Sequence, residues 1–307
     1  MTDRLKKMPV PLLPTMVGAC TLSNVYSGQG FSLVRDITMI SAAIIWIVYL
    51  IRIFTRFEVC KEEYKTTVPS SLYAGFTMLM MLVGSYVFEY SSGLGKFFWG
   101  AGIGIHAIHI LIFTYRNIIK NFNIDTFVPS YFVTYNGIMV SVVIGGVMKE
   151  PGISKIITYY GIGVFTIIIP FMIYRLIKHE IKDGVFHTQA ILLAPSSLCT
   201  VSYLNISSNP NPYILGYLYI SVLLALIFII YRLPRFFSFS FTPAFAGLTF
   251  PMAIGIVATT KIVGYLKGIG SENLAYWLGQ LSGIQLYITS GLIFYVLLNM
   301  FIWIRKD

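Results

Sequence analysis

The chain has 307 residues, of which 56% are hydrophobic and only 11% are charged, and its mean hydropathy is +0.76. A soluble domain carries roughly 25% charged residues, so this composition excludes a soluble globule. The net charge of +10 comes from basic residues scattered in small groups, which argues against a nucleic-acid partner. Three cysteines exclude a disulfide framework and are expected to be free thiols.

Apolar stretches about 20 residues long follow one another along the whole chain, and each is long enough to cross a hydrocarbon layer of about 30 Å. They predict an all-α polytopic membrane protein, with residues 1–307 forming a single transmembrane domain. The ten expected helices cover residues 9–27, 36–54, 69–88, 95–115, 127–148, 153–174, 188–206, 212–231, 239–262 and 273–303.

The lysines and arginines predict how these spans are oriented. Sixteen of the 22 lie at the two termini or in loops that follow even-numbered spans, and six lie on the opposite side. Because cytoplasmic loops are enriched in lysine and arginine, both termini are expected in the cytoplasm. The protein itself is expected in the cell inner (plasma) membrane.

Prolines open the odd-numbered spans at regular intervals. They are Pro9, Pro69, Pro129, Pro195 and Pro243, separated by 60, 60, 66 and 48 residues. Each interval matches one two-helix unit, which predicts five helical hairpins. Hairpins that enter the membrane from the same side are related by rotation about its normal, so five of them form a pseudo-fivefold ring. The odd spans are richer in small and hydroxylated residues, so the odd helices are expected to line a central pore.

The chemistry of the odd spans favours passive or weakly coupled anion permeation. Between their prolines and their far ends they contain no Asp, Glu, Lys, Arg or His, whereas coupled proton or cation transport normally needs such a group within the membrane. Five helix N-termini would point at the cytoplasmic mouth and favour anions there. Possible pore-lining donors are Thr134, Asn136, Thr200 and Ser202, although hydrogen bonds between helices explain these side chains equally well.

The ten-span pattern, with residues 192–197 (LLAPSS) and 247–252 (GLTFPM), resembles the tellurite-resistance/dicarboxylate transporter family. This family includes the bacterial protein TehA and the plant slow anion channels, and the resemblance covers essentially the whole chain. It implies a TehA-like homotrimer in which every protomer has its own pore, lined by the odd helices and gated by a phenylalanine on helix 9. The matching residue in this sequence is Phe250.

Residue chemistry is compatible with a gate at Phe250. Pro251 follows directly, and an interior proline removes a helix hydrogen bond and kinks the helix, so we expect a pore kink that lets the ring project into the lumen. A hydrophobic constriction of this kind gates by excluding water. Phe76 lies seven residues after Pro69, as Phe250 does after Pro243, and is a possible secondary constriction.

Three further residues allow more than one interpretation. His106 and His109 are three residues apart, which suits hydrogen bonds to neighbouring helices, with a metal or proton-relay role as the alternative. Lys261 ends the ninth span and either extends to the lipid headgroups or collects anions at the outer mouth. We expect no metal site and no cofactor.

These features predict an anion channel or channel-like transporter for small inorganic or carboxylate anions, surrounded by membrane lipids. The alternative is a secondary transporter of C4-dicarboxylates or of tellurite and other oxyanions. A membrane-embedded enzyme is disfavoured, because the odd spans lack the clustered carboxylates, histidines or metal ligands that such catalysis needs.

Overall fold

The computed structural model describes residues 5–306, and within that range the regular structure is entirely helical. The first half contains α2 (Leu12–Gly28), α3 (Ser32–Thr55), α4 (Phe57–Lys65), α5 (Thr67–Leu72), α6 (Ala74–Val87), α7 (Ser92–Thr114), the π-helix η1 (Tyr115–Lys120), α8 (Tyr131–Gly137), α9 (Val140–Val143) and the 3₁₀ helix η2 (Gly145–Met148). The second half contains α10 (Pro151–Lys178), the 3₁₀ helix η3 (Asp183–Leu192), α11 (Leu193–Ile206), α12 (Pro212–Phe236), the 3₁₀ helix η4 (Pro243–Leu248), α13 (Thr249–Gly268) and α14 (Glu272–Lys306).

Each expected span coincides with helical structure, but most odd spans are interrupted. The fifth is divided among α8, α9 and η2, and the seventh and ninth begin as the 3₁₀ helices η3 and η4. By length and composition, seven helical stretches of the described chain qualify as membrane spans. At 17 and 14 residues, α2 and α11 are too short to qualify alone. The amphipathic helix α4 was not expected, because it lies in a charged segment between two spans.

Burial separates the helices into two groups. The stretches Thr67–Val87 and Pro243–Gly268 are 83% and 72% buried, whereas α3, α10, α12 and the α7–η1 stretch are between 22% and 33% buried. α2 and α11 are also largely buried, and α14 is largely exposed. We call the five odd-numbered stretches the buried segments (α2; α5–α6; α8–α9–η2; η3–α11; η4–α13). The outer helices are α3, α7, α10, α12 and α14.

The outer helices turn bulky apolar side chains away from the protein. On α3 the exposed residues include Leu33, Ile37, Ile44, Ile51 and Phe54, and the other outer helices show the same pattern. Exposed apolar surface on this scale marks a membrane contact. The chain is therefore an integral membrane protein whose buried segments are shielded from lipid by the outer helices.

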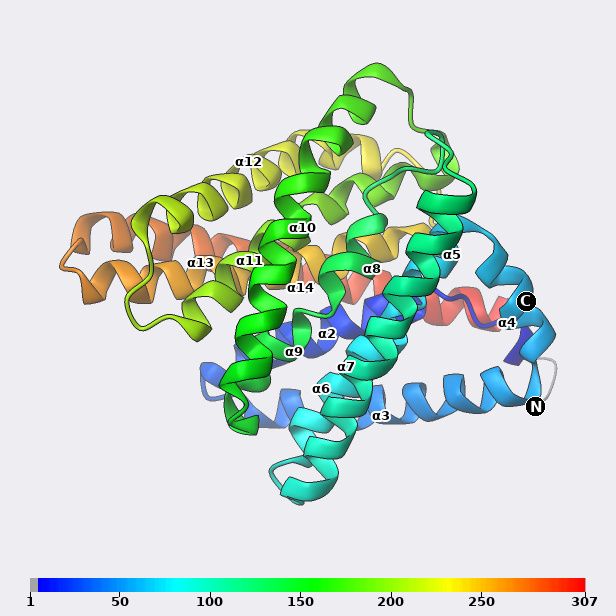
Figure 1. Cartoon of the computed structure of the whole chain (residues 1–307), viewed down its shortest axis with the longest axis horizontal. Coiled ribbons are helices and arrows are strands. Elements are labelled where there is room, and N and C mark those ends of the chain that lie inside the picture. The colour runs from blue at the N-terminus through cyan, green and yellow to red at the C-terminus, as the bar shows by residue number, and fades with distance from the viewer. Residues whose placement is uncertain (1–4, 307) are drawn as a thin grey trace.

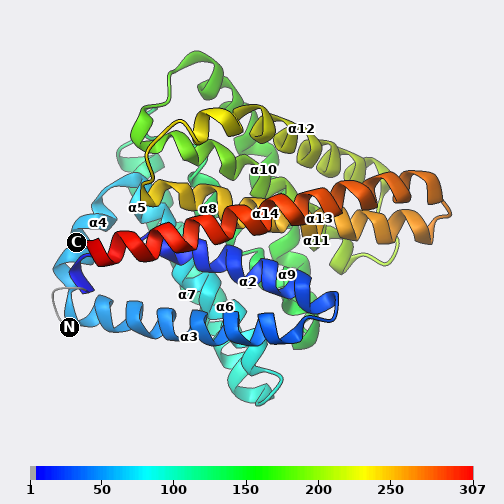
Figure 2. The same cartoon turned by 180° about the vertical axis from the view of Figure 1, so that it is seen from behind.

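The buried segments contact one another in chain order. α2 packs against α6, α6 against α8 and α9, these two against α11, α11 against α13, and α13 returns to α2. Each outer helix lies between two buried segments: α3 contacts α2 and α6, and α14 contacts α13 and α2. Figures 1 and 2 show the outer helices α3 and α14 on either side of α2.

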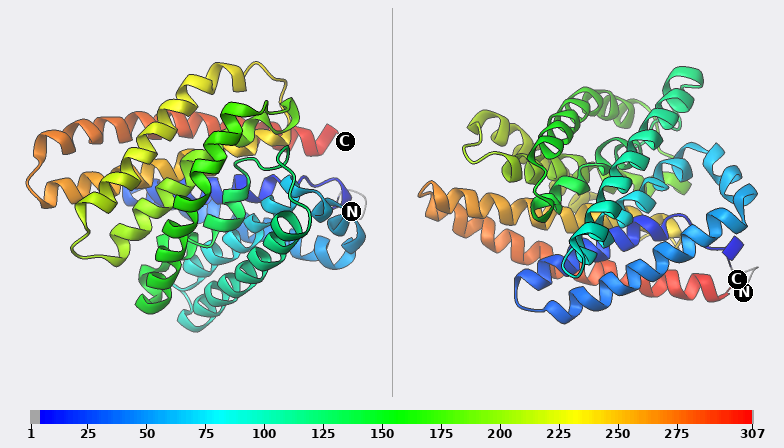
Figure 3. Two further views of the ribbon diagram at one scale, coloured as in Figure 1. Left: turned by 45° about the horizontal axis from the view of Figure 1, so that its top comes forward. Right: turned by 60° about the horizontal axis from the view of Figure 1, so that its bottom comes forward.

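The molecule has two distinct ends. The described chain begins and ends at the same end of the molecule (Figures 1, 2 and 3). The helix α5, which carries Pro69, lies near this end as well (Figures 1 and 2), and we call it the proline end. The turns between α2 and α3 and between α13 and α14 lie at the opposite end, the turn end (Figure 1). Gly30 and Gly270 have φ of 96° and 76° in these turns, a conformation that favours glycine.

Candidate functional site

Two cavities lie among the buried segments, one toward each end of the molecule. The proline-end cavity has a volume of about 550 Å³, and every buried segment contributes to its wall. The turn-end cavity has a volume of about 1000 Å³ and is lined by the far ends of these segments, extending between α13 and α14. Phe250 is the single residue that lines both cavities among the described residues. Phe250 therefore borders both cavities.

Local sequence places Phe250 where the helix type changes. The ninth segment runs as a 3₁₀ helix to Leu248, and Phe250 is the second residue of α13. Pro251 lies in the first turn of α13, where its missing N–H is tolerated. Phe250 is 6% exposed, and that small surface faces the two cavities.

The backbone at Phe250 is held by a close approach of α2. A Cβ added to Gly18 would lie 2.6 Å from the backbone nitrogen of Phe250 and 2.9 Å from the Cβ of Thr249, so only glycine allows the two helices to meet here. The Thr249 hydroxyl donates to the carbonyl of Ala246 at 2.7 Å. Neighbouring backbone thus fixes the position from which the Phe250 ring extends.

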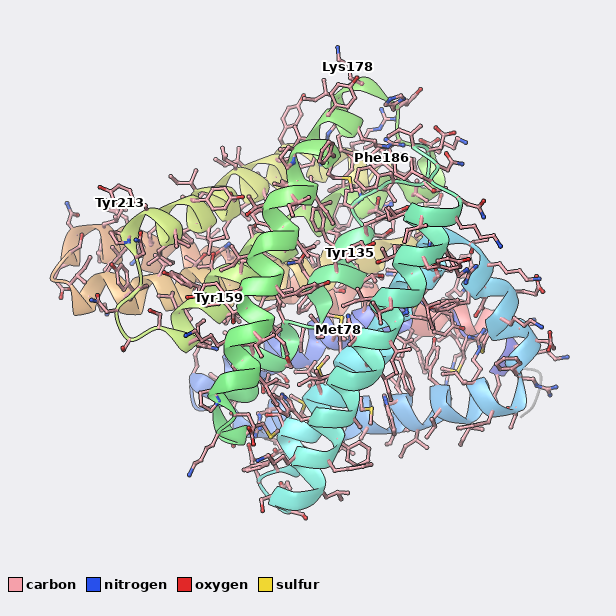
Figure 4. All side chains as sticks on the ribbon, in the orientation of Figure 1. Met78, Tyr135, Tyr159, Lys178, Phe186 and Tyr213 are labelled. Carbon is pink, nitrogen blue, oxygen red and sulfur yellow. The ribbon has the colours of Figure 1, made fainter. Side chains whose placement is uncertain are left out.

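The wall of the proline-end cavity is mostly apolar. Met78, Phe132 and Leu198 line it from three different segments, together with Phe250. Met78 is buried and lies near the middle of the bundle in Figure 4, whereas Lys178 and Tyr213 lie at its periphery. Helix N-termini were expected to favour anions at the cytoplasmic mouth, whereas the one charged residue in the described lining of this cavity is an acid, Glu63. The basic residues of this end lie away from the cavity wall.

The turn-end cavity carries a different set of charges. Arg35, Glu89 and Lys261 line it. Arg35 donates to both carboxylate oxygens of Glu89, at 3.1 and 2.5 Å, and to Asn24 at 3.0 Å. Within residues 5–306 Lys261 forms no ion pair. Because Arg35 and Glu89 neutralise each other, Lys261 leaves this cavity with one uncompensated positive charge.

Several residues predicted to face a pore lie outside both cavities. Phe76 stacks on Trp46 of the outer helix α3, with ring centroids 5.1 Å apart. Asn136 donates to the carbonyl of Gly161 in α10 at 3.0 Å, and Thr200 donates to Ser196 in its own helix at 2.9 Å. The fully buried Ser202 has no hydrogen-bond partner among the described residues. Of these residues, Asn136 has the hydrogen bond between helices that the packing interpretation expects.

The two histidines bond neighbouring helices, as the first interpretation of their spacing expects. His106 Nε2 donates to the carbonyl of Thr134 at 2.8 Å, and His109 Nε2 lies 3.2 Å from the hydroxyl of the same residue. Tyr64 of α4 lies 2.6 Å from His109 Nδ1. Burial raises the pKa of Tyr64 to about 12, against the opposing charge of Arg116, so its hydroxyl stays protonated and able to donate at neutral pH. Among the described residues no group of three potential ligands could hold a metal ion.

Sequence reasoning missed one functional candidate, the ion pair of Arg52 and Glu63. Arg52 Nη2 lies 2.6 Å from a carboxylate oxygen of Glu63, and the arginine side chain is fully buried. Arg52 falls inside an expected membrane span, and an ionisable residue within a span is by itself a signal of a functional site. In the sequence, Arg52 was used only as one of the basic residues that predict the orientation of the spans.

The fold and its cavities define an integral membrane protein whose outer helices enclose buried segments with a cavity toward each end. Residues 10–304 match the SLAC1 family, described as voltage-dependent anion channel. The chain belongs to this family, which confirms the family resemblance seen in its motifs and indicates anion channel or transporter activity rather than catalysis. No curated protein matches the chain.

Proposed function

We propose that the protein is an anion channel, or a channel-like transporter, with a pore running through the ring of buried segments. Ten membrane-spanning helices form this ring as five hairpins in a pseudo-fivefold arrangement, with the odd segments around the pore. The closed circuit of contacts among the buried segments supports this arrangement. The two cavities then form the two vestibules of the pore.

The observation that carries the proposal is that Phe250 lines both cavities, and we propose that its ring lies between them. An apolar ring at the narrowest point keeps water and hydrated ions from passing, which is how hydrophobic constrictions gate. Pro251 supports this role, since it lies beside the ring where the 3₁₀ helix gives way to α13. Phe250 is therefore the proposed gate. Phe76, Thr134, Asn136, Thr200 and Ser202 remain weaker pore candidates, because neither cavity includes them.

Charge at the turn end is consistent with an anionic substrate. Lys261 lines that cavity without an acidic partner among the described residues and would attract small anions. Beyond it the path is mostly apolar, and the one charged residue in the described lining of the proline-end cavity is the acid Glu63, so this path offers no cationic site for a divalent anion. Small monovalent anions such as chloride or nitrate therefore fit the proposed route better than C4-dicarboxylates do.

Assembly and orientation complete the proposal. We expect a homotrimer in the cell inner membrane, with a separate pore in each protomer and the proline end facing the cytoplasm. The positive-inside distribution supports this orientation, and the apolar outer helices offer surfaces for both lipid and a second protomer. Cross-linking in native membranes and labelling of single cysteines introduced at each end measure these two features.

The function is tested by anion flux into liposomes that contain purified protein, with chloride, nitrate, malate and tellurite supplied in turn. A channel gives flux of chloride and nitrate that dissipates their gradients without a counter-substrate, and Phe250→Ala increases it strongly. A secondary transporter instead gives saturable malate or tellurite flux that depends on protons or on internal substrate. Flux of no anion, by the wild type and by Phe250→Ala alike, would contradict both possibilities.

A further inference from the structure

The ion pair of Arg52 and Glu63 lies at the wall of the proline-end cavity. Glu63 lines the cavity and its side chain is 27% exposed, whereas the Arg52 side chain behind it is 0% exposed. Arg52 Nη1 and Nη2 donate to the two carboxylate oxygens at 2.9 and 2.6 Å. The carboxylate thus fills a planar, two-pronged donor site at the cavity wall.

A third donor completes this site. The Tyr73 hydroxyl donates to Glu63 Oε2 at 2.5 Å and lies 3.0 Å from Arg52 Nη1. Tyr73 lies between α5 and α6, at the entrance of a buried segment, whereas Arg52 belongs to α3 and Glu63 to α4. Three donors from two separate elements therefore converge on one negatively charged group.

Arg52 is also held in place without Glu63. Its Nε donates to the carbonyl of Leu5 at 2.8 Å, and its Nη2 to the carbonyl of Lys6 at 3.3 Å. Because these backbone acceptors fix the guanidinium, it would keep its position if the carboxylate left. The donor site is consequently preformed for an anion, and the carboxylate is the group that occupies it.

We infer that Arg52 and Tyr73 form a binding site for a small planar monovalent anion, and that the Glu63 carboxylate occupies this site as a tethered ligand. Nitrate and formate share the charge and trigonal oxygen geometry of a carboxylate, so they accept the same hydrogen bonds. The inference rests on the proposed function in one respect: by filling the site and adding a negative charge, Glu63 limits anion entry from the proline end. Its neighbour Glu62, which pairs with Lys65 on the exposed face of α4, provides a matched control.

Binding is tested first, by thermal unfolding of the purified protein in detergent. Glu63→Ala leaves a buried guanidinium without its counter-ion, which lowers the unfolding temperature. Added formate or nitrate should restore that temperature saturably in Glu63→Ala, and chloride should restore it less. Wild type and Glu62→Ala should show only the general response to salt. Adding Arg52→Met to Glu63→Ala should abolish the rescue, and a rescue that survives this change would overturn the inference.

Glu63→Gln keeps the shape of the side chain and covers the case in which Glu63→Ala does not fold. In the Phe250→Ala background it removes one negative charge from the cavity wall, so nitrate flux from the proline end should rise about tenfold. Unchanged flux, with conduction by Phe250→Ala intact, would refute the role of Glu63 but not the channel. A silent Phe250→Ala would refute the channel, while the binding measurement would still decide the site.

Discussion

Shortening the side chain at position 250 should open the proposed pore in proportion to the space created. Phe250→Ala removes the whole ring, leaving a void several times larger than the 10–15 Å³ that one water molecule needs. That void would join the cavities of about 550 and 1000 Å³ into one continuous space. Phe250→Leu removes less volume, so anion conductance in planar bilayers should rise from wild type through Leu to Ala.

Phe245 is a matched control for Phe250. Phe245→Ala should lower stability more than Phe250→Ala does, but only Phe250→Ala should create a conductance. Phe245 lies on the same segment but is fully buried, outside both cavities, with its ring centroid 4.1 Å from that of His187. Phe245→Ala should cost about 3–5 kcal/mol of the unfolding free energy, as for a packed core aromatic, and create no conductance. Phe250→Ala should cost less than about 3 kcal/mol, because cavities border its ring. Equal conductance in both variants, or none in Phe250→Ala at normal surface expression, would refute the assignment of the gate.

Three further outcomes follow from the same geometry. Gly18→Ala should lower the unfolding free energy by about 1–3 kcal/mol, because the added Cβ would meet the backbone of Phe250. Gly28→Ala, on the same helix, places its Cβ in open space and should change the unfolding free energy little. Thermal unfolding measures both. Lys261→Gln should reduce chloride conductance of the opened channel at low salt and lose this effect at about 1 M salt, whereas Lys267→Gln, outside the cavity, should leave conductance unchanged. His106→Leu should destabilise the protein by about 1–3 kcal/mol in chemical denaturation, because the buried carbonyl of Thr134 loses the hydrogen bond from the imidazole. Added chelator should not change the stability of the wild type.

Much of the fold was predictable because lipid imposes simple rules on the sequence. Apolar length located the buried segments and the outer helices, although not the charged helix α4, and the bulky apolar residues of α3 and the other outer helices identified the exposed group. The interruptions were less predictable. Pro243 predicts where the ninth segment begins. Local sequence alone does not show that this segment starts as a 3₁₀ helix and becomes an α-helix at Thr249.

Some residues of the candidate site could be predicted from local sequence, and others could not. Phe250 and Pro251 belong to a short recognisable motif, so their neighbourhood could be predicted. Thr134 and Asn136 lie on a buried segment as expected, but which way a side chain turns on a short, broken helix depends on its partners, here His109 and Gly161. Glu63 could not have been found by hydropathy, because the contact between α4 and Arg52 joins residues on separate helices.

The proposed channel depends on a continuous anion path that the Phe250 ring closes. The most direct test is the reversal potential of Phe250→Ala in a planar bilayer under a tenfold chloride gradient. An anion channel gives a reversal close to the chloride equilibrium potential, about 59 mV in magnitude for a monovalent ion, and a pH gradient does not change it. A reversal at zero, of the cation sign, or following the proton gradient would contradict the proposed channel.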